Sequence, residues 1–218
     1  MNILILDTTT YSPAFAYYIG EKQVISVIAE NERNADTVVM LMKNEFSGHG
    51  ISMKDIGIVS LSNGPGSYTG LRVGSAIAKG ICTASGARLV EISTLDILAE
   101  TSAGNVSAVI PSNSRTLEFY YADYSPENGR MKRQSEYMID VIENINKRGK
   151  IIVIDKAEKI SFPAGMQVFH SDGKMKIDAQ HRLTMDKISK GEFADVSKSE
   201  PFYMKDFVPL KSNKNKLI

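Results

Sequence analysis

The chain has 218 residues, of which 43% are hydrophobic and 23% charged, and its formal net charge is +1. This composition excludes a disordered or fibrous protein and is typical of one globular domain or of two small lobes. The single cysteine, Cys82, excludes an intrachain disulfide framework, and no apolar run approaches the roughly 18 residues of a membrane-spanning helix. Because a carboxylate, Asp7, follows only four apolar residues, too early for an export signal, we expect a cytoplasmic protein without membrane contact.

Three short strands are predicted at the beginning of the chain, at residues 3–6, 14–19 and 24–28, where apolar, β-branched and aromatic residues are concentrated. A helix is expected next. Asn34 and Asp36 are good residues for its N-cap, and Gly48 is expected to stop it.

A further strand at residues 56–62 leads directly into the glycine-rich loop 63–70. The pattern then predicts a helix over 71–85, a strand over 89–92 and a helix over 95–101. In the first of these helices, Gly70, Gly74 and Ala78 recur at four-residue intervals. Small residues at that spacing indicate a surface on which another backbone packs closely.

Polarity rises around residues 103–105, where we place a boundary between an N-terminal lobe (1–104) and a smaller C-terminal α/β lobe (105–218). Strands are expected at 106–110, 117–124, 151–154 and 166–169, Asp172-Gly173 is interpreted as a hairpin turn, and the last segment is expected to pack back on the first lobe. Three strands before the first helix favour an actin-like α/β fold over a dinucleotide-binding fold, which usually places a helix directly after its first strand.

The run from Gly64 to Gly74, GPGSYTGLRVG, resembles the signature of the TsaB (YeaZ) family, a subunit of the tRNA threonylcarbamoyladenosine system. Shorter matches follow the family order: Asp7-Thr8-Thr9, Ser93-Thr94-Leu95 and Pro201–Lys205. The resemblance implies an actin-like ATPase (ASKHA, RNase H-like) fold, with two lobes of mixed sheets flanked by helices.

The same resemblance implies a non-catalytic scaffold subunit that dimerises with TsaD and works with the ATPase TsaE. Together they support threonylcarbamoyl transfer to adenosine 37 of tRNA, which this subunit is expected to meet only indirectly, through the complex. In the absence of TsaD, a homodimer is expected, because an exposed apolar patch seldom stays uncovered.

Two segments are candidates for binding a nucleotide or a phosphate: Asp7-Thr8-Thr9 and Gly66-Ser67. Asp7 ends a buried strand in front of three hydroxyl side chains, as in actin-like ATPases that hold a magnesium ion and a phosphate. The glycines of the loop expose N–H groups ahead of a helix N-terminus, where anions are favoured. Two alternatives stay open: that Asp7 and the hydroxyls satisfy loop backbone groups, and that the glycines only permit tight packing. We expect no intrinsic cofactor, with any ATP or ADP and magnesium placed at the partner interface.

No catalytic residue or metal ligand is predicted. The histidines His49, His170 and His181 are too widely spaced for a metal motif, and the sequence around Ser67 is not the Gly-x-Ser-x-Gly of a hydrolase nucleophile. A peptidase therefore has little support. An independent ATPase or small-molecule kinase of the actin-like fold remains the alternative to a scaffold.

The partner surface is expected on the first two helices, whose apolar stripes are typical of a helix-to-helix interface. The residues expected at this surface are Val38, Val39, Met42, Leu71, Arg72, Val73, Ile77 and Ile81. The alternative is that the same stripes face the chain's own sheet.

Overall fold

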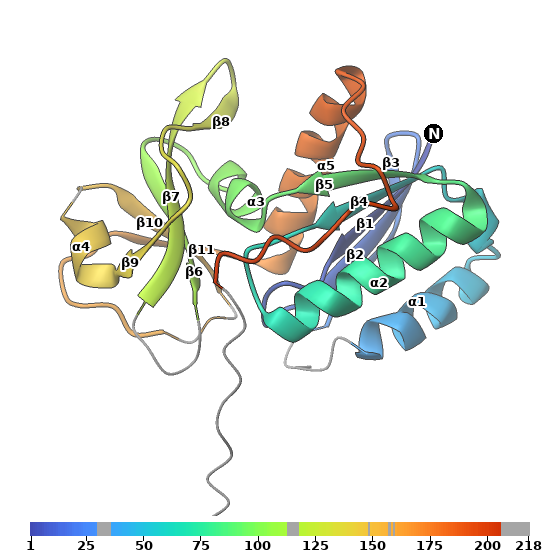
Figure 1. Ribbon diagram of the computed structural model, residues 1–218, viewed down its shortest axis with the longest axis horizontal. Helices are drawn as coiled ribbons and strands as arrows, with labels where there is room; N and C mark the ends of the chain where they lie inside the picture. Colours follow the sequence, from blue (N-terminus) through green and yellow to red (C-terminus); the bar gives the residue numbers. More distant parts are fainter. Residues whose placement is uncertain (30–35, 113–117, 148, 157, 159, 206–218) are drawn as a thin grey trace, which may run out of the picture.

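The computed structural model describes residues 1–29, 36–112, 118–147, 149–156, 158 and 160–205. These residues form two β-sheets that lie next to each other, each flanked by helices (Figure 1). The strands of the first sheet are β1 (Asn2–Asp7), β2 (Ala14–Ile19), β3 (Lys22–Ile28), β4 (Ile58–Ser62) and β5 (Arg88–Ile92). Their order is β3-β2-β1-β4-β5. Strands β1, β2 and β3 pair antiparallel, whereas β4 and β5 continue the sheet parallel to β1.

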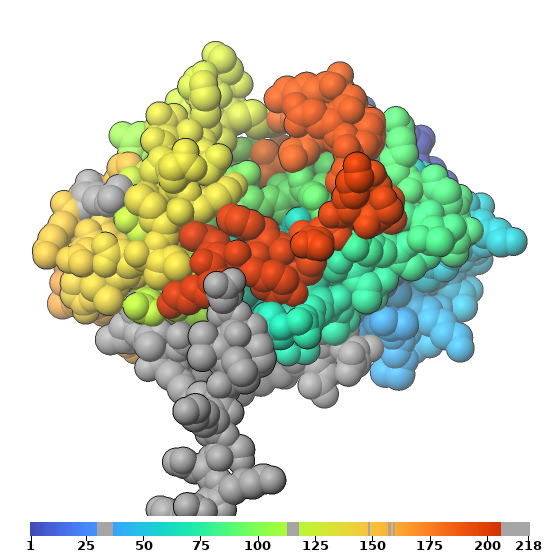
Figure 2. All heavy atoms as spheres, in the orientation of Figure 1, coloured from blue at the N-terminus to red at the C-terminus, as the bar shows by residue number. Residues whose placement is uncertain are grey.

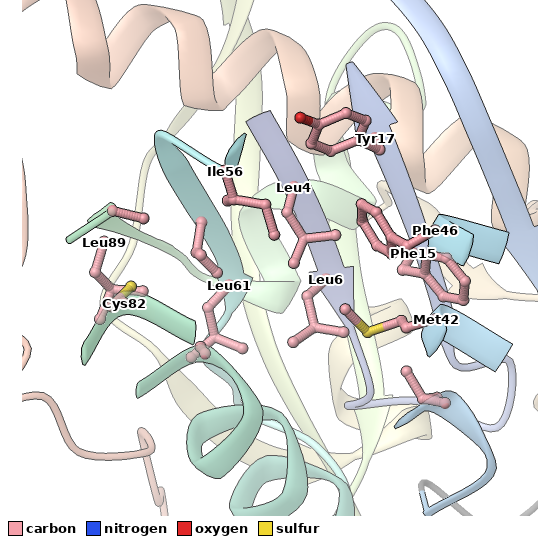
Figure 3. Packing of buried hydrophobic residues seen from close by; sticks show 14 of the residues in the cluster. Leu4, Leu6, Phe15, Tyr17, Met42, Phe46, Ile56, Leu61, Cys82 and Leu89 are labelled. Carbon is pink, nitrogen blue, oxygen red and sulfur yellow. The ribbon is translucent and has the colours of Figure 1, made fainter. Parts of the chain in front are cut away.

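Helices cover both faces of the first sheet, which explains why its central strand β1 contains a continuous apolar run. Leu4 and Leu6 of β1 point to one face, where α1 (Asp36–Gly48) and α2 (Tyr68–Ser85) close the core shown in Figure 3. Ile3 and Ile5 point to the other face, where they pack with residues of α3 (Thr94–Glu100) and α5 (Gly173–Ser189). A short 3-10 helix, η1 (Met53–Asp55), precedes β4.

The second sheet has the order β11-β10-β6-β7-β8, with β9 pairing to β7. Its elements are β6 (Val106–Pro111), β7 (Glu118–Glu127), β8 (Arg130–Arg133), β9 (Met138–Val141), α4 (Ile142–Asn146), β10 (Ile151–Asp155) and β11 (Val168–Ser171). Strand β6 pairs antiparallel with β7 and parallel with β10, so this sheet is also mixed. One face packs against α3 and the other against α4. Two mixed sheets flanked by helices are the architecture that the sequence predicts.

Every helix and strand expected within residues 1–101 is present, with shifts of a few residues at their ends. The N-cap expected at Asn34 lies outside the described residues. The chain passes from the first sheet to the second between Ile92 and Val106, which brackets the boundary placed near residue 104. The division into lobes at that residue stays a prediction.

The interpretation of Asp172-Gly173 as a hairpin turn is wrong. Asp172 is the N-cap of the 17-residue helix α5, and its carboxylate accepts a hydrogen bond from the backbone N–H of Met175 at 2.8 Å. Helix α5 follows the last strand of the second sheet but lies on the first. Thr184 and Ser60 of β4 share a buried hydroxyl hydrogen bond of 2.7 Å.

Candidate functional site

Asp7 lies at the carboxyl end of β1, and the three threonines that follow it turn the chain away from the sheet. One oxygen of Asp7, Oδ1, accepts two hydrogen bonds from Thr9, from its backbone N–H at 2.9 Å and from its hydroxyl at 2.6 Å. Asp7, Thr8 and Thr9 are each at most 2% exposed. The carboxylate is therefore held by its own loop rather than presented to solvent.

The glycine-rich loop between β4 and α2 lies against this threonine segment. Ser67 caps α2, because its hydroxyl accepts from the N–H of Gly70 at 3.3 Å. The N–H of Ser67 donates to the carbonyl of Thr9 at 2.8 Å, and the hydroxyl of Thr8 donates to the carbonyl of Gly70 at 2.7 Å. The structure thus brings together all five residues predicted for phosphate binding, but the N–H groups of Ser67 and Gly70 bond within the protein.

Close backbone packing explains the glycines of this loop. A Cβ atom on Gly66 would lie 2.5 Å from the carbonyl oxygen of Thr9, and one on Gly70 would overlap the carbonyl oxygen of Thr8. A Cβ atom on Gly74 would overlap the hydroxyl of Thr8. Side chains at these positions would push the loop and α2 away from β1, so this geometry favours the packing interpretation over the phosphate interpretation.

A residue that the sequence analysis missed, Lys176 of α5, occupies the centre of the site. Its side chain is 1% exposed, and its ammonium donates to Oδ2 of Asp7 at 3.0 Å and to the hydroxyl of Thr10 at 2.7 Å. The same ammonium lies 2.6 Å from Oδ2 of Asp155, at the end of β10. One cation therefore joins the ends of a strand from each sheet. The only sequence signal for it is a lysine four residues after the N-cap Asp172.

These contacts shift the pKa values of the charged groups at the site. Burial alone would raise the pKa of Asp7, but the Lys176 ammonium and the hydrogen bonds from Thr9 hold that pKa below its ordinary value. Burial alone would lower the pKa of Lys176, but Asp7 and Asp155 together raise it. Glu158, 7% exposed, lies near the same group, and burial together with the charge of Asp155 raises its pKa to about 7.

The magnesium ion that an actin-like ATPase would hold next to Asp7 does not fit the residues present. The position between the two aspartates is taken by the Lys176 ammonium, which repels a cation. Within the described part of the chain, no group of three or more His, Cys, Asp or Glu side chains is arranged to hold a metal ion.

The residues predicted for the partner surface divide into two sets. Val38, Met42 and Leu71 are at most 4% exposed, and Val38 and Met42 belong to the core between the helices and the first sheet. The prediction is wrong for these three residues, because side chains buried in the chain's own core cannot contact a partner. The residues that keep solvent-exposed surface are Val39, Arg72, Val73, Ile77 and Ile81. Met40, which the prediction left out, is 58% exposed.

Arg72 contacts the end of the described chain. Its guanidinium lies 4.1 Å from the ring centroid of Tyr68, and its Nε donates to the hydroxyl of Tyr203 at 3.3 Å. The N–H of Phe202 donates to the carbonyl of Asn63 at 2.9 Å. Figure 2 shows this last segment, in red, lying between the second sheet and α2. The glycine-rich motif and the motif at residues 201–205 are therefore neighbours in space.

Among the helices of the described residues, none combines the length and the apolar character that crossing a membrane requires.

Comparison with protein families gives a match to the model described as TsaD, tRNA N6-adenosine threonylcarbamoyltransferase, over residues 31–198. Two similar curated proteins, both described as tRNA threonylcarbamoyladenosine biosynthesis protein TsaB, come from Buchnera aphidicola subsp. Schizaphis graminum and from Escherichia coli. The first is 29% identical over 170 residues, 72% of this chain and 80% of the relative, and the second is 24% identical over 231 residues, 97% of each chain. Among solved structures, YeaZ from Pseudomonas aeruginosa superposes with a TM-score of 0.72 at 18% identity, over 93% of this chain and 99% of that one.

Proposed function

Since the chain belongs to the TsaD family and its curated homologues are TsaB proteins, we propose that it is a non-catalytic subunit that dimerises with TsaD and supports threonylcarbamoyl transfer to tRNA. The broader part of this proposal, a role in tRNA threonylcarbamoyladenosine biosynthesis, is supported by the homologues. The scaffold role is the finer part of the proposal, and the geometry of two regions supports it.

The observation that carries the non-catalytic part is the ion pair of Asp7 with Lys176. In an ATPase of this fold, the carboxylate at the end of the first strand has to be available to a metal ion and a phosphate. Here its two oxygens bond to Thr9 and to Lys176, and the site is buried. A nucleotide, if the complex uses one, belongs at the interface with the partner instead.

The exposed apolar face of α1 and α2 supports a partner at that position. Val39 and Met40 are 52% and 58% exposed, large values for apolar side chains of a helix. Both helices lie on the same face of the first sheet, and Ile77 and Ile81 of α2 pack on the core there while remaining partly exposed. We propose this face as the TsaD interface and as the homodimer interface of the isolated protein. We further propose that the protein contacts TsaE, and that it meets tRNA only through the complex.

Light scattering coupled to size-exclusion chromatography tests the interface, with the TsaD protein of the same organism as partner. The wild type is expected to form a heterodimer, and Met40→Glu/Ile77→Glu to lose it, because two charges would be buried without partners. Ile19→Glu is the matched control, since Ile19 is an exposed apolar residue (48%) at the end of β2 rather than on either helix. Equal loss in the control, or no loss in the double variant, would reject this face.

ATP hydrolysis by the purified protein alone tests the non-catalytic part. No turnover above that of an Asp7→Asn variant is expected. Turnover that this substitution abolishes would contradict the proposal and favour an independent ATPase or kinase.

A further inference from the structure

The Lys176 ammonium is surrounded by oxygen atoms of the kind that coordinate a hard metal cation. Three oxygen atoms lie within 3.0 Å of it: one from Asp7, one from Asp155 and the hydroxyl of Thr10. Carboxylate and hydroxyl oxygens are the ligands that magnesium and manganese ions prefer. They come from the ends of β1 and β10 and from the loop after β1, so the fold itself brings them to one point.

We propose that the Lys176 ammonium is a built-in replacement for a divalent cation. It fills a latent magnesium or manganese site formed by Asp7, Asp155 and Thr10, and shortening this side chain opens that site to the metal ion. The inference does not depend on the pathway or on the partner of the protein.

Charge supports this reading of the cluster. The site holds two carboxylates against one ammonium, and a third carboxylate, Glu158, is buried nearby. A single positive charge leaves the group negative overall. A dication would neutralise both aspartates, so the site without Lys176 should attract one.

Position supports it as well. Lys176 reaches the site from α5, which lies on the first sheet, while Asp155 belongs to the second sheet. The buried ammonium therefore links α5 to the end of β1 and to the end of β10, as a metal ion at the same position would link its ligands.

Manganese binding by the full chain tests the proposal, with Mn²⁺ alone as the probe. Lys176→Ala is expected to bind one Mn²⁺ per chain with a Kd of about 1 mM or lower, the range of weak sites built from oxygen ligands. Its Tm should rise by about 5 °C or more at roughly a hundredfold excess of Mn²⁺ over Kd. The wild type should show neither effect.

Two control variants make the result specific. Lys174→Ala removes an exposed lysine two residues away, whose ammonium pairs with Asp178 at 2.9 Å, and it should behave as the wild type. Lys176→Ala/Asp155→Asn removes one of the two carboxylates and should lose the Mn²⁺ effect. Equal Mn²⁺ binding by the wild type and Lys176→Ala, or a folded Lys176→Ala that binds none, would overturn the proposal.

The wild type provides an independent test should Lys176→Ala fail to fold. Reductive methylation of the native protein, followed by peptide mapping, should modify Lys174 and leave Lys176 unmodified, because a buried, ion-paired ammonium cannot react. Modification of both lysines at similar rates would show that the ammonium does not occupy the site, and would also overturn the proposal.

Discussion

Replacing Gly70 by alanine should destabilise the protein, whereas the same replacement at Gly80 of the same helix should stabilise it. A Cβ atom on Gly70 would overlap the carbonyl oxygen of Thr8 and lie 3.0 Å from its carbonyl carbon. Both are backbone atoms, so no change of rotamer can remove the overlap. A Cβ atom on Gly80 would meet nothing within 4 Å.

The expected magnitudes follow from two opposing effects. Alanine in the interior of a helix is more stable than glycine by about 0.5–1 kcal/mol, and Gly80→Ala should gain this amount. At Gly70 the overpacking costs about 1–3 kcal/mol or more, which outweighs the gain. Gly74→Ala should fall between them, because the hydroxyl of Thr8 that its Cβ would meet can rotate away, at the loss of a hydrogen bond worth about 1 kcal/mol.

Urea unfolding followed by circular dichroism measures all three variants against the wild type. The order of stability is expected to be Gly80→Ala, wild type, Gly74→Ala and Gly70→Ala. Gly70→Ala with the stability of the wild type would refute the packing argument and restore the interpretation of the loop as a phosphate cradle.

Two further predictions concern buried titratable groups. Glu158 has a pKa of about 7 in the folded protein against an ordinary 4.5, so the folded state keeps a proton that the unfolded state has lost, and stability falls as pH rises across that interval. Glu158→Gln should therefore be more stable than the wild type by up to about 3 kcal/mol at pH 8 but by less than about 1 kcal/mol at pH 5, in urea unfolding at both values; a larger difference at pH 5 than at pH 8 would contradict it. Burial raises the pKa of the Cys82 thiol to about 11, so its reaction with a thiol reagent at pH 8 should be at least about a hundredfold slower in the native protein than in denaturant. Comparable rates would show that the helix carrying Cys82 opens readily.

The first half of the fold could be predicted from the sequence because its patterns are simple. Strand β1 is covered on both faces and therefore contains a continuous apolar run, and Gly64–Gly74 marks the start of α2. Helix α5 could not be predicted from apolar periodicity. Its buried face carries Lys176, Gln180 and Thr184 at four-residue spacing, and these polar side chains are buried because their partners lie in the first sheet and in the loop that follows β1.

The site could be predicted only in part for a related reason. Asp7 and the glycine loop are recognisable as local motifs, but Lys176 lies 169 residues from Asp7 and carries no motif of its own. The partner surface shows the same limit, since an apolar stripe does not reveal which of its residues the chain's own core uses. Val38 belongs to that core, and its neighbour Val39 is exposed.

The position of α5 has a consequence for protein synthesis. The side chain of Gln180 donates to the carbonyl of Leu6, 174 residues earlier, at 3.3 Å, and Ile177 helps to cover Ile3 and Ile5. A ribosome needs roughly 5–20 s to add the hundred or so residues between the end of β5 and the end of α5. Until α5 has been synthesised, that face of the first sheet lacks the cover of Ile177 and Ala179, and only α3 can pack on it. The strands that are synthesised first are thus among the last to be fully enclosed.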